Sequence, residues 1–223
     1  MNLSRFGESS TPHVFVAIYD WDGSHFSEIP FSTLDIGKED RSLRCNNFQL
    51  LDQDADGDQE IALALGSPFS GFAIINYNSN GLSLTKKVRP DQLLVGSGLL
   101  YIGVVDYDGD GYDDVLALSP DGSTIKAQPF YNIGGVFDSG HLVRKKIDGL
   151  NGILPYSIEL TDWDSDGFFD VLTPFSSGDI LALTLTPATL VIEEVPITTG
   201  PLTQVVVEDV NQDGYEDILT LSS

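Results

Sequence analysis

The sequence lacks several features that would assign a chain to a known class of protein. It holds one cysteine, Cys45, so no internal disulfide can form, and the free thiol is expected to be a small buried hydrophobe. Basic residues are scarce: 11 Lys and Arg stand against 34 Asp and Glu, a net charge of −23. Nucleic acids and anionic membranes require clustered cations, which this chain does not supply. Cations are its natural partners.

Long apolar runs are also absent. No stretch approaches the ~18 apolar residues of a membrane span, and residues 1–7 lack the basic and apolar segments of a secretory signal. Hydrophobic residues still make up 41% of the 223 residues, at a mean hydropathy of 0.00. That is too apolar for an acidic disordered tail and enough for one sizeable core. The sequence predicts one soluble globular domain over residues 1–223.

Signatures of common enzyme classes are missing as well. The sequence has no phosphate-binding glycine loop, no paired zinc histidines and no serine nucleophile elbow. The three histidines, His13, His25 and His141, are far apart in the chain and are expected in turns or in solvent. We expect no catalytic residues and no enzymatic activity.

What the sequence does contain is a repeat. Four nine-residue segments, 52–60, 106–114, 162–170 and 209–217, share alternating acids, a glycine at the sixth position and an acid at the ninth. They hold 18 of the 34 acidic residues and no base, so most of the net charge belongs to them. Short apolar runs flank each segment, which is typical of two strands joined by a turn. Each segment is predicted to be the tip of a hairpin.

This loop chemistry favours calcium, a hard cation that takes six to eight oxygen ligands. Side chains at positions 1, 3, 5 and 9 would point inward, the glycine would allow a sharp turn, and position 7 would offer its backbone carbonyl. The glutamate that an EF-hand needs at position 12 is missing. Up to four Ca²⁺ ions are predicted, on Asp52, Asp54, Asp56, Asp58 and Glu60; Asp106, Asp108, Asp110, Tyr112 and Asp114; Asp162, Asp164, Asp166, Phe168 and Asp170; and Asp209, Asn211, Asp213, Tyr215 and Asp217.

A simpler interpretation is that Asp-Gly pairs favour hairpin turns without any metal. Four crowded carboxylate loops would then repel themselves in every repeat, which favours the metal interpretation. Two loops depart from the full pattern, because Glu60 replaces the final aspartate of the first and Asn211 the second acid of the last. These two loops are expected to bind calcium more weakly.

Second hairpins, without the acidic pattern, lie before and between the acidic ones. They are expected over residues 14–29 with a turn at Asp22–Gly23, over 72–88, over 124–143 with a turn near Gly134–Gly135, and over 180–195 with a turn near Pro187. Alternation of the two kinds gives about sixteen antiparallel strands with no helical pattern, which is typical of a β-propeller.

The predicted fold is all-β, a four-bladed β-propeller closed by its terminal half-blades. After a lead over residues 1–13, residues 14–35 would join 202–223 in one composite blade. The other blades would span about 46–90, 99–147 and 156–197. Such closure removes open sheet edges. An open arc that a second chain completes into a larger ring is the alternative that the sequence leaves open.

The repeated Asp-x-Asp-x-Asp-Gly-x-x-Asp between two strands resembles the FG-GAP and VCBS repeats of integrin α-subunit-type propellers. The resemblance covers four copies over roughly residues 48–223, and the stretches 66–68 and 118–120 are similar to its Gly-Ala-Pro element. It implies calcium-stabilised blade tips and roles in adhesion, carbohydrate binding or protein docking. The best-known relatives have seven blades, whereas this chain has room for four.

Two further features have competing interpretations. Aromatic residues recur in the loops, at Tyr107, Tyr112, Trp163, Phe168 and Tyr215, where packing between blades competes with stacking on a sugar. Trp21 is the aromatic we would test first as a ligand contact.

Basic clusters at residues 86–89 and 144–146 would either protect exposed sheet edges or dock an acidic partner. Glu193 and Glu194 occupy the matching strand of the next repeat, so head-to-tail self-association is a further expectation.

The function expected from the sequence is a non-enzymatic, calcium-binding module for protein interaction, structure or adhesion. Extracellular calcium is abundant enough to fill weak loops, so an extracellular, cell-surface or virion-surface location is expected. The partner is expected to be a protein or a glycan, with no nucleic acid and no insertion into a membrane. The alternatives are a carbohydrate-binding lectin and an accessory domain of a secreted hydrolase or lyase.

Overall fold

The fold is known from a computed structural model. It describes residues 14–27, 30, 32–36, 45–66, 69–89, 101–121, 124–140, 142–146, 159–162, 170–174, 180–186, 189–195 and 202–222. Every element in these ranges is a β-strand, and all strand pairs are antiparallel, as the sequence predicts. No helix among these residues is long and apolar enough to cross a bilayer.

The strands form five sheets. The N-terminal hairpin pairs β1 (Phe15–Ile18) with β2 (Ser32–Asp35). A four-stranded sheet follows, with β3 (Cys45–Leu51), β4 (Glu60–Leu65), β5 (Gly71–Asn78) and β6 (Gly81–Val88). The third contains β7 (Tyr101–Val105), β8 (Asp114–Asp121), β9 (Thr124–Ile133), β10 (Val136–Ser139) and β11 (Val143–Lys146). The fourth contains β12 (Glu159–Thr161), β13 (Asp170–Pro174), β14 (Ile180–Thr186) and β15 (Thr189–Val195). The C-terminal hairpin pairs β16 (Leu202–Glu208) with β17 (Asp217–Ser222).

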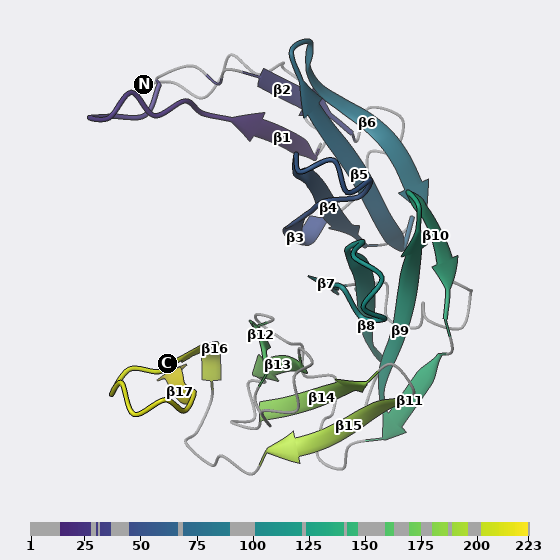
Figure 1. Cartoon of the computed structure of the whole chain (residues 1–223), viewed down its shortest axis with the longest axis vertical. Coiled ribbons are helices and arrows are strands. Elements are labelled where there is room, and N and C mark those ends of the chain that lie inside the picture. The colour runs from purple at the N-terminus through teal and green to yellow at the C-terminus, as the bar shows by residue number, and fades with distance from the viewer. Residues whose placement is uncertain are drawn as a thin grey trace.

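The sheets follow one another along an arc, with β3, β7, β12 and β16 on its inner side and β6, β10, β11 and β15 toward its outer side (Figure 1). The terminal hairpins lie at the two ends of this arc. They form separate two-stranded sheets, so strand pairing among the described residues does not join them into the predicted composite blade. An all-β arrangement of antiparallel sheets is therefore what the structure establishes.

Apolar side chains hold neighbouring sheets together. One buried cluster joins the β3–β6 and β7–β11 sheets, where the Phe72 and Phe130 rings meet edge to face at 5.2 Å. A second joins the β12–β15 sheet to the C-terminal hairpin through Leu172, Val205 and Val207. A third packs the N-terminal hairpin onto the β3–β6 sheet. Burial of apolar area between adjacent sheets is the main stabilising contribution in such a stack.

Two predicted hairpins differ in detail. The N-terminal hairpin turns at Asp22–Gly23 as predicted, but its return strand is β2, beyond the predicted end at Ile29. Pairing begins beside the turn, where Trp21 and Phe26 form a bridge and the Ser27 amide donates to the Asp20 carbonyl at 2.8 Å. Pro30, which has no N–H to donate to a ladder, precedes β2. The outer strand of the β7–β11 sheet is split into β10 and β11, both paired with β9. Pro129 of β9 lies at the split and accepts the Gly140 amide there, but it offers no donor in return.

Cys45 corrects another expectation. The thiol is exposed and not buried in the core, and its Sγ lies 3.5 Å from the carbonyl oxygen of Asn47. The sequence misplaced it because β3 begins at this residue with one face uncovered. Its side chain lines a groove between β1 and β3, described below.

Candidate metal centre

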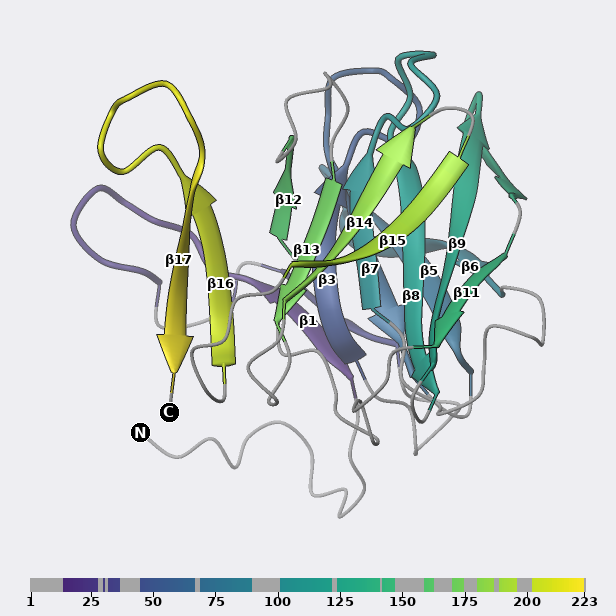
Figure 2. The same ribbon diagram turned by 90° about the horizontal axis from the view of Figure 1, so that it is seen from below.

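The acidic segments lie where the sequence places them, between the first two strands of successive sheets. Residues 52–60 join β3 to β4, residues 106–114 join β7 to β8, and residues 209–217 join β16 to β17. We call these the first, second and fourth loops; all three project at the same end of the molecule (Figure 2). The third loop connects β12 to β13, and its interior, with Asp164, Asp166 and Phe168, lies outside the described residues.

One pattern of hydrogen bonds recurs in the three described loops. The carboxylate at position 1 accepts the amides of positions 5 and 6, as Asp106 accepts those of Asp110 at 3.1 Å and Gly111 at 3.0 Å. The same pairs are Asp52 with Asp56 and Gly57, and Asp209 with Asp213 and Gly214. The position 5 carboxylate accepts the amide of position 7 in each loop. The loops are therefore three copies of one structure, not three unrelated turns.

Backbone conformation recurs with the hydrogen bonds. The glycine at position 6 has φ near +90° in all three loops, at Gly57, Gly111 and Gly214, as the turn predicts. Position 4 is also left-handed, and there the residues are Ala55, Gly109 and Gln212. The sequence does not reveal this second position, because only one of these loops has a glycine there. Ala55 and Gln212 carry a steric cost that the surrounding carboxylate bonds offset.

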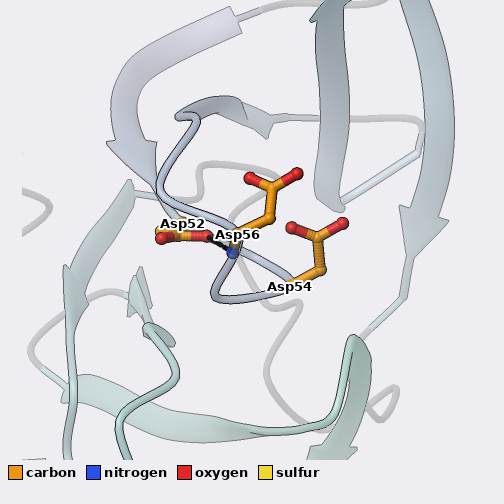
Figure 3. Close-up of side chains that lie close together, drawn as sticks. All are labelled: Asp52, Asp54 and Asp56. Carbon is orange, nitrogen blue, oxygen red and sulfur yellow. Dashed lines mark hydrogen bonds between the residues drawn. The ribbon is translucent and has the colours of Figure 1, made fainter.

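Two loops bring three carboxylates together. Oxygen atoms of Asp52, Asp54 and Asp56 lie within 4.8 Å of one another, as do those of Asp106, Asp108 and Asp114. Figure 3 shows the first group around its turn, with Asp52 bonded to the Asp56 amide. Hard oxygen donors at this spacing fit a divalent cation such as calcium. Among the described residues no other group of this kind occurs, and in the fourth loop Asn211 occupies position 3.

The ninth position is a buried anchor in the first three loops, whereas Asp217 of the fourth is partly buried. Glu60, Asp114 and Asp170 are all almost fully buried. Asp114 accepts the amides of Tyr107 at 2.9 Å and Asn132 at 2.6 Å. Glu60 accepts the Gln53 amide at 2.9 Å and the Asn76 side chain at 3.1 Å, and it is not part of the first carboxylate group.

Burial raises the pKa of two of these anchors, Asp114 and Glu60. It is the first cause of the raised pKa of Asp114, about 6, to which the Asp108 and Asp110 carboxylates add while the two backbone hydrogen bonds oppose the rise. Burial likewise raises the pKa of Glu60, and burial followed by repulsion from Asp110 raises the pKa of Asp108. Crowded acids held partly away from water are costly as anions, and a bound cation would relieve that cost.

Not every predicted ligand can be assigned. Asp58, Tyr112 and Tyr215 donate their amides to the position 5 carboxylates, and coordination by their carbonyls stays a prediction. Of the loop aromatics, Tyr107 is buried against Tyr131 with ring centroids 5.6 Å apart, whereas Tyr215 is exposed. Tyr131 belongs to β9 of the same sheet, so packing between blades stays a prediction for Tyr107, and it is wrong for Tyr215. Trp163 lies outside the described residues, as do His13 and His141, whereas His25 lies exposed in a turn as predicted.

The basic clusters lie on outer strands, as expected. Lys86 and Lys87 belong to β6, and Arg144 and Lys146 belong to β11. Lys87 and Arg89 lie over the ring of Phe69, at 5.6 and 4.7 Å from its centroid. These two cation–π contacts lie beside the β3–β6 sheet, whereas Lys86 lies over the Phe137 ring of β10 in the next sheet, 5.4 Å from its centroid.

Sequence reasoning missed the residues that link one loop to the next. Asp113 accepts the Asp52 amide at 2.7 Å, and the Asn132 side chain donates to the Gln53 carbonyl at 2.6 Å. Asp113 stands at position 8, which varies between the repeats, and Asn132 lies outside them. No repeat pattern marks either residue.

Comparison with models of known protein families gives no match, and comparison with curated proteins gives none either. The interpretation of the loops therefore rests on their residues and geometry.

Proposed function

We propose that this chain is a calcium-stabilised β-propeller of the FG-GAP and VCBS type that serves as a non-enzymatic binding or assembly module on an extracellular or particle surface. The observation that carries the proposal is the shared structure of three acidic loops, two of which gather three carboxylates. An Asp-Gly turn needs no carboxylates at positions 1, 3 and 5 to form a hairpin. Repeated placement of these acids is explained by a cation.

Calcium would act by making each hairpin tip rigid. In the described loops, carboxylates accept backbone amides, so a cation would find its ligands largely in place. Bound metal would neutralise the crowded acids and hold the strand ends together. The propeller, made rigid in this way, would then present one face or its rim to a protein partner.

The register of the sheets supports a closed four-bladed ring. Ala62 and Ala64 of β4 pack toward Ile102 and Val104 of β7 in the cluster between those two sheets. Ala62 and Ala64 lie two and four residues after position 9 of the first loop. Ile102 and Val104 lie four and two residues before position 1 of the second loop. The β3–β6 and β12–β15 sheets thus present their second strands, β4 and β13, to the first strands of their successors, β7 and β16.

Applied once more, that register matches the two ends of the arc. The counterparts of Ala62 and Ala64 on the C-terminal hairpin are Leu219 and Leu221, which are 44% and 59% exposed. The counterparts of Ile102 and Val104 on β3 are Phe48 and Leu50, which are 65% and 50% exposed. Four exposed apolar side chains would cover one another if the C-terminal hairpin completed the blade of the N-terminal hairpin.

Thermal unfolding with excess chelator and then with about 1 mM calcium tests the metal proposal. Calcium at one hundred times its Kd would stabilise the fold by about 2.7 kcal/mol per site. We expect a clear rise in Tm with calcium and a smaller one with magnesium at equal ionic strength, because magnesium sheds its water reluctantly.

Asp108→Asn should reduce the calcium-dependent rise, whereas Asp138→Asn, an exposed acid outside the loops, should leave it intact. If calcium does not change the Tm and metal analysis finds no calcium bound to the purified chain, the proposed function is wrong.

A carbohydrate-binding role is the second candidate, and one observation favours it. Trp21 and Phe26 are exposed at the tip of the N-terminal hairpin, with ring centroids 4.9 Å apart. Exposed aromatic faces can stack on sugar rings. Binding on a glycan array that is lost in Trp21→Ala would support this role, and absence of binding across a broad array would exclude it.

A further inference from the structure

Asn132 of β9 lies where two acidic loops meet. Its side chain is almost fully buried and makes hydrogen bonds with both of its polar atoms. Nδ2 donates to the carbonyl of Gln53 at 2.6 Å, in the first loop, and to that of Asp113 at 3.2 Å, in the second. Oδ1 accepts the Gly135 amide at 2.9 Å. One side chain thereby fixes two loops and the β9–β10 turn.

Two more hydrogen bonds run in parallel with it. The Asp113 carboxylate accepts the amide of Asp52, the first acid of the first loop, at 2.7 Å. The Gln53 side chain donates to the Gly135 carbonyl at 2.8 Å. Residues of the second sheet therefore hold the backbone of the first loop beside its carboxylate group.

We infer that Asn132 and Asp113 are positioning residues that join the first two loops into one cooperative unit, so that calcium in one loop raises the calcium affinity of the other. This inference rests on the calcium binding proposed above. Ordering the first loop also orders Asp113 and the Asn132 amide, so the second ion meets a loop that is already fixed. The first ion also reduces the negative charge that the second loop faces.

The fourth loop is the internal reference. It has the same pattern of position 1 and position 5 hydrogen bonds, and the bonds described for it are all internal. Its position 8 residue, Glu216, is exposed, whereas Asp113 at the same position in the second loop bonds to the first. Coupling is thus expected between the first two loops and not with the fourth.

The experiment is a calcium titration of the full chain followed by NMR, with the position 6 glycine amides as separate reporters of the loops. Gly57, Gly111 and Gly214 report the first, second and fourth loops. Asp108→Asn removes a carboxylate from the second loop only. We expect it to move the Gly57 midpoint to at least about fivefold higher calcium and to leave Gly214 unchanged.

A double-mutant cycle isolates the link. In an Asn132→Ala background, Asp108→Asn should no longer move the Gly57 midpoint. Asn76→Ala is the matched control, since Asn76 contacts the anchor Glu60 of the first loop from the same sheet and has no described bond to the second loop. In that background the shift of Gly57 should persist.

A second variant avoids the buried site. Asp113→Ala removes the acceptor of the Asp52 amide at a partly exposed position, and Glu216→Ala is its counterpart in the fourth loop. Asp113→Ala should abolish the coupling, and Glu216→Ala should preserve it. If Gly57 and Gly111 titrate independently in the wild type, the inference is overturned while calcium binding stands. If no glycine amide responds to calcium, the proposed function fails and the coupling with it.

Discussion

At the scale of single residues, the acidic loops combine two kinds of carboxylate. Asp54 and Asp108 are exposed acids whose oxygens belong to the gathered groups. Glu60 and Asp114 are buried acids that accept amides from the start of their own loops. The exposed acids suit an ion that arrives from solvent, and the buried ones fix the loop that receives it.

The buried anchor of the second loop predicts a pH dependence. Because burial raises the pKa of Asp114 to about 6, above its ordinary value of 3.8, the metal-free fold binds this proton more tightly than the unfolded chain does. Asp114 therefore contributes stability below about pH 4, and this contribution is lost as the pH rises through 6. Protons compete with calcium for Asp114 over the same pH interval, so the calcium affinity of the second loop should rise as the pH increases from 4 to above 6.

Because the pKa of Asp114 is about 6, competition from its proton should weaken the apparent calcium affinity of the second loop about tenfold at pH 5 relative to pH 7.5. The Gly111 amide should show this shift in calcium titrations at the two pH values. The Gly214 amide is the reference, because Asp217 in the fourth loop is only partly buried. Equal Gly111 midpoints at both pH values would contradict the assignment of Asp114 to the site.

At the scale of elements, each described acidic loop is a nine-residue turn that needs two left-handed residues. Position 6 is always glycine, and the space beside Gly111 is open, with no atom within 4 Å of the point where a Cβ would lie. A substitution at this position therefore tests backbone conformation without a steric clash.

Gly111→Ala should destabilise the metal-free fold by about 1–2 kcal/mol, because alanine is unfavourable at positive φ. Ala55→Gly should have the opposite sign, about 0.5 kcal/mol of stabilisation, since relief of the left-handed alanine exceeds the added freedom of the unfolded chain. Urea unfolding in chelator measures both changes. Destabilisation by Ala55→Gly would show that position 4 carries no such cost.

The elements also show what the sequence could predict. Apolar runs around acidic turns placed β3, β4, β7, β8, β16 and β17, because period and turn chemistry are local properties. The split between β10 and β11 depends on which edge of β9 Pro129 faces, which is a tertiary property. The bonds of Asn132 to the first loop depend on sheet stacking across 79 residues of chain, and no local pattern encodes them.

At the scale of the whole molecule, the arc leaves one apolar groove at its beginning. A cavity of about 480 Å³ lies between β1 and β3 and is lined by Phe15, Ile18, Cys45, Phe48 and Leu63, among others. The N-terminal hairpin covers the outer part of the β3–β6 sheet, next to β6. The inner part, at β3, is where two further strands would complete a blade. The C-terminal hairpin is a two-stranded sheet with an exposed apolar face.

The single cysteine allows a direct test of closure. Cys45 lines the groove, and Leu221 lies on the exposed face of β17, so a short bismaleimide should join Cys45 to the new thiol of Leu221→Cys. The matched control is Ile133→Cys, which is equally exposed but lies at the β9–β10 turn. We expect a bridge within one chain for Leu221→Cys and none for Ile133→Cys, as read from intact mass and the cross-linked peptide.

The size of the cross-linked product separates the two ways of covering the groove. Within one chain, the tether gives the C-terminal hairpin an effective concentration near the millimolar range, so closure should dominate in dilute protein. A dimer that grows with protein concentration would instead mean that arcs join head to tail, because an interface between unlike surfaces forms rings or filaments. That outcome would contradict the closed four-bladed ring while leaving the structure of the acidic loops intact, since the bonds of the position 1 carboxylates lie within each loop.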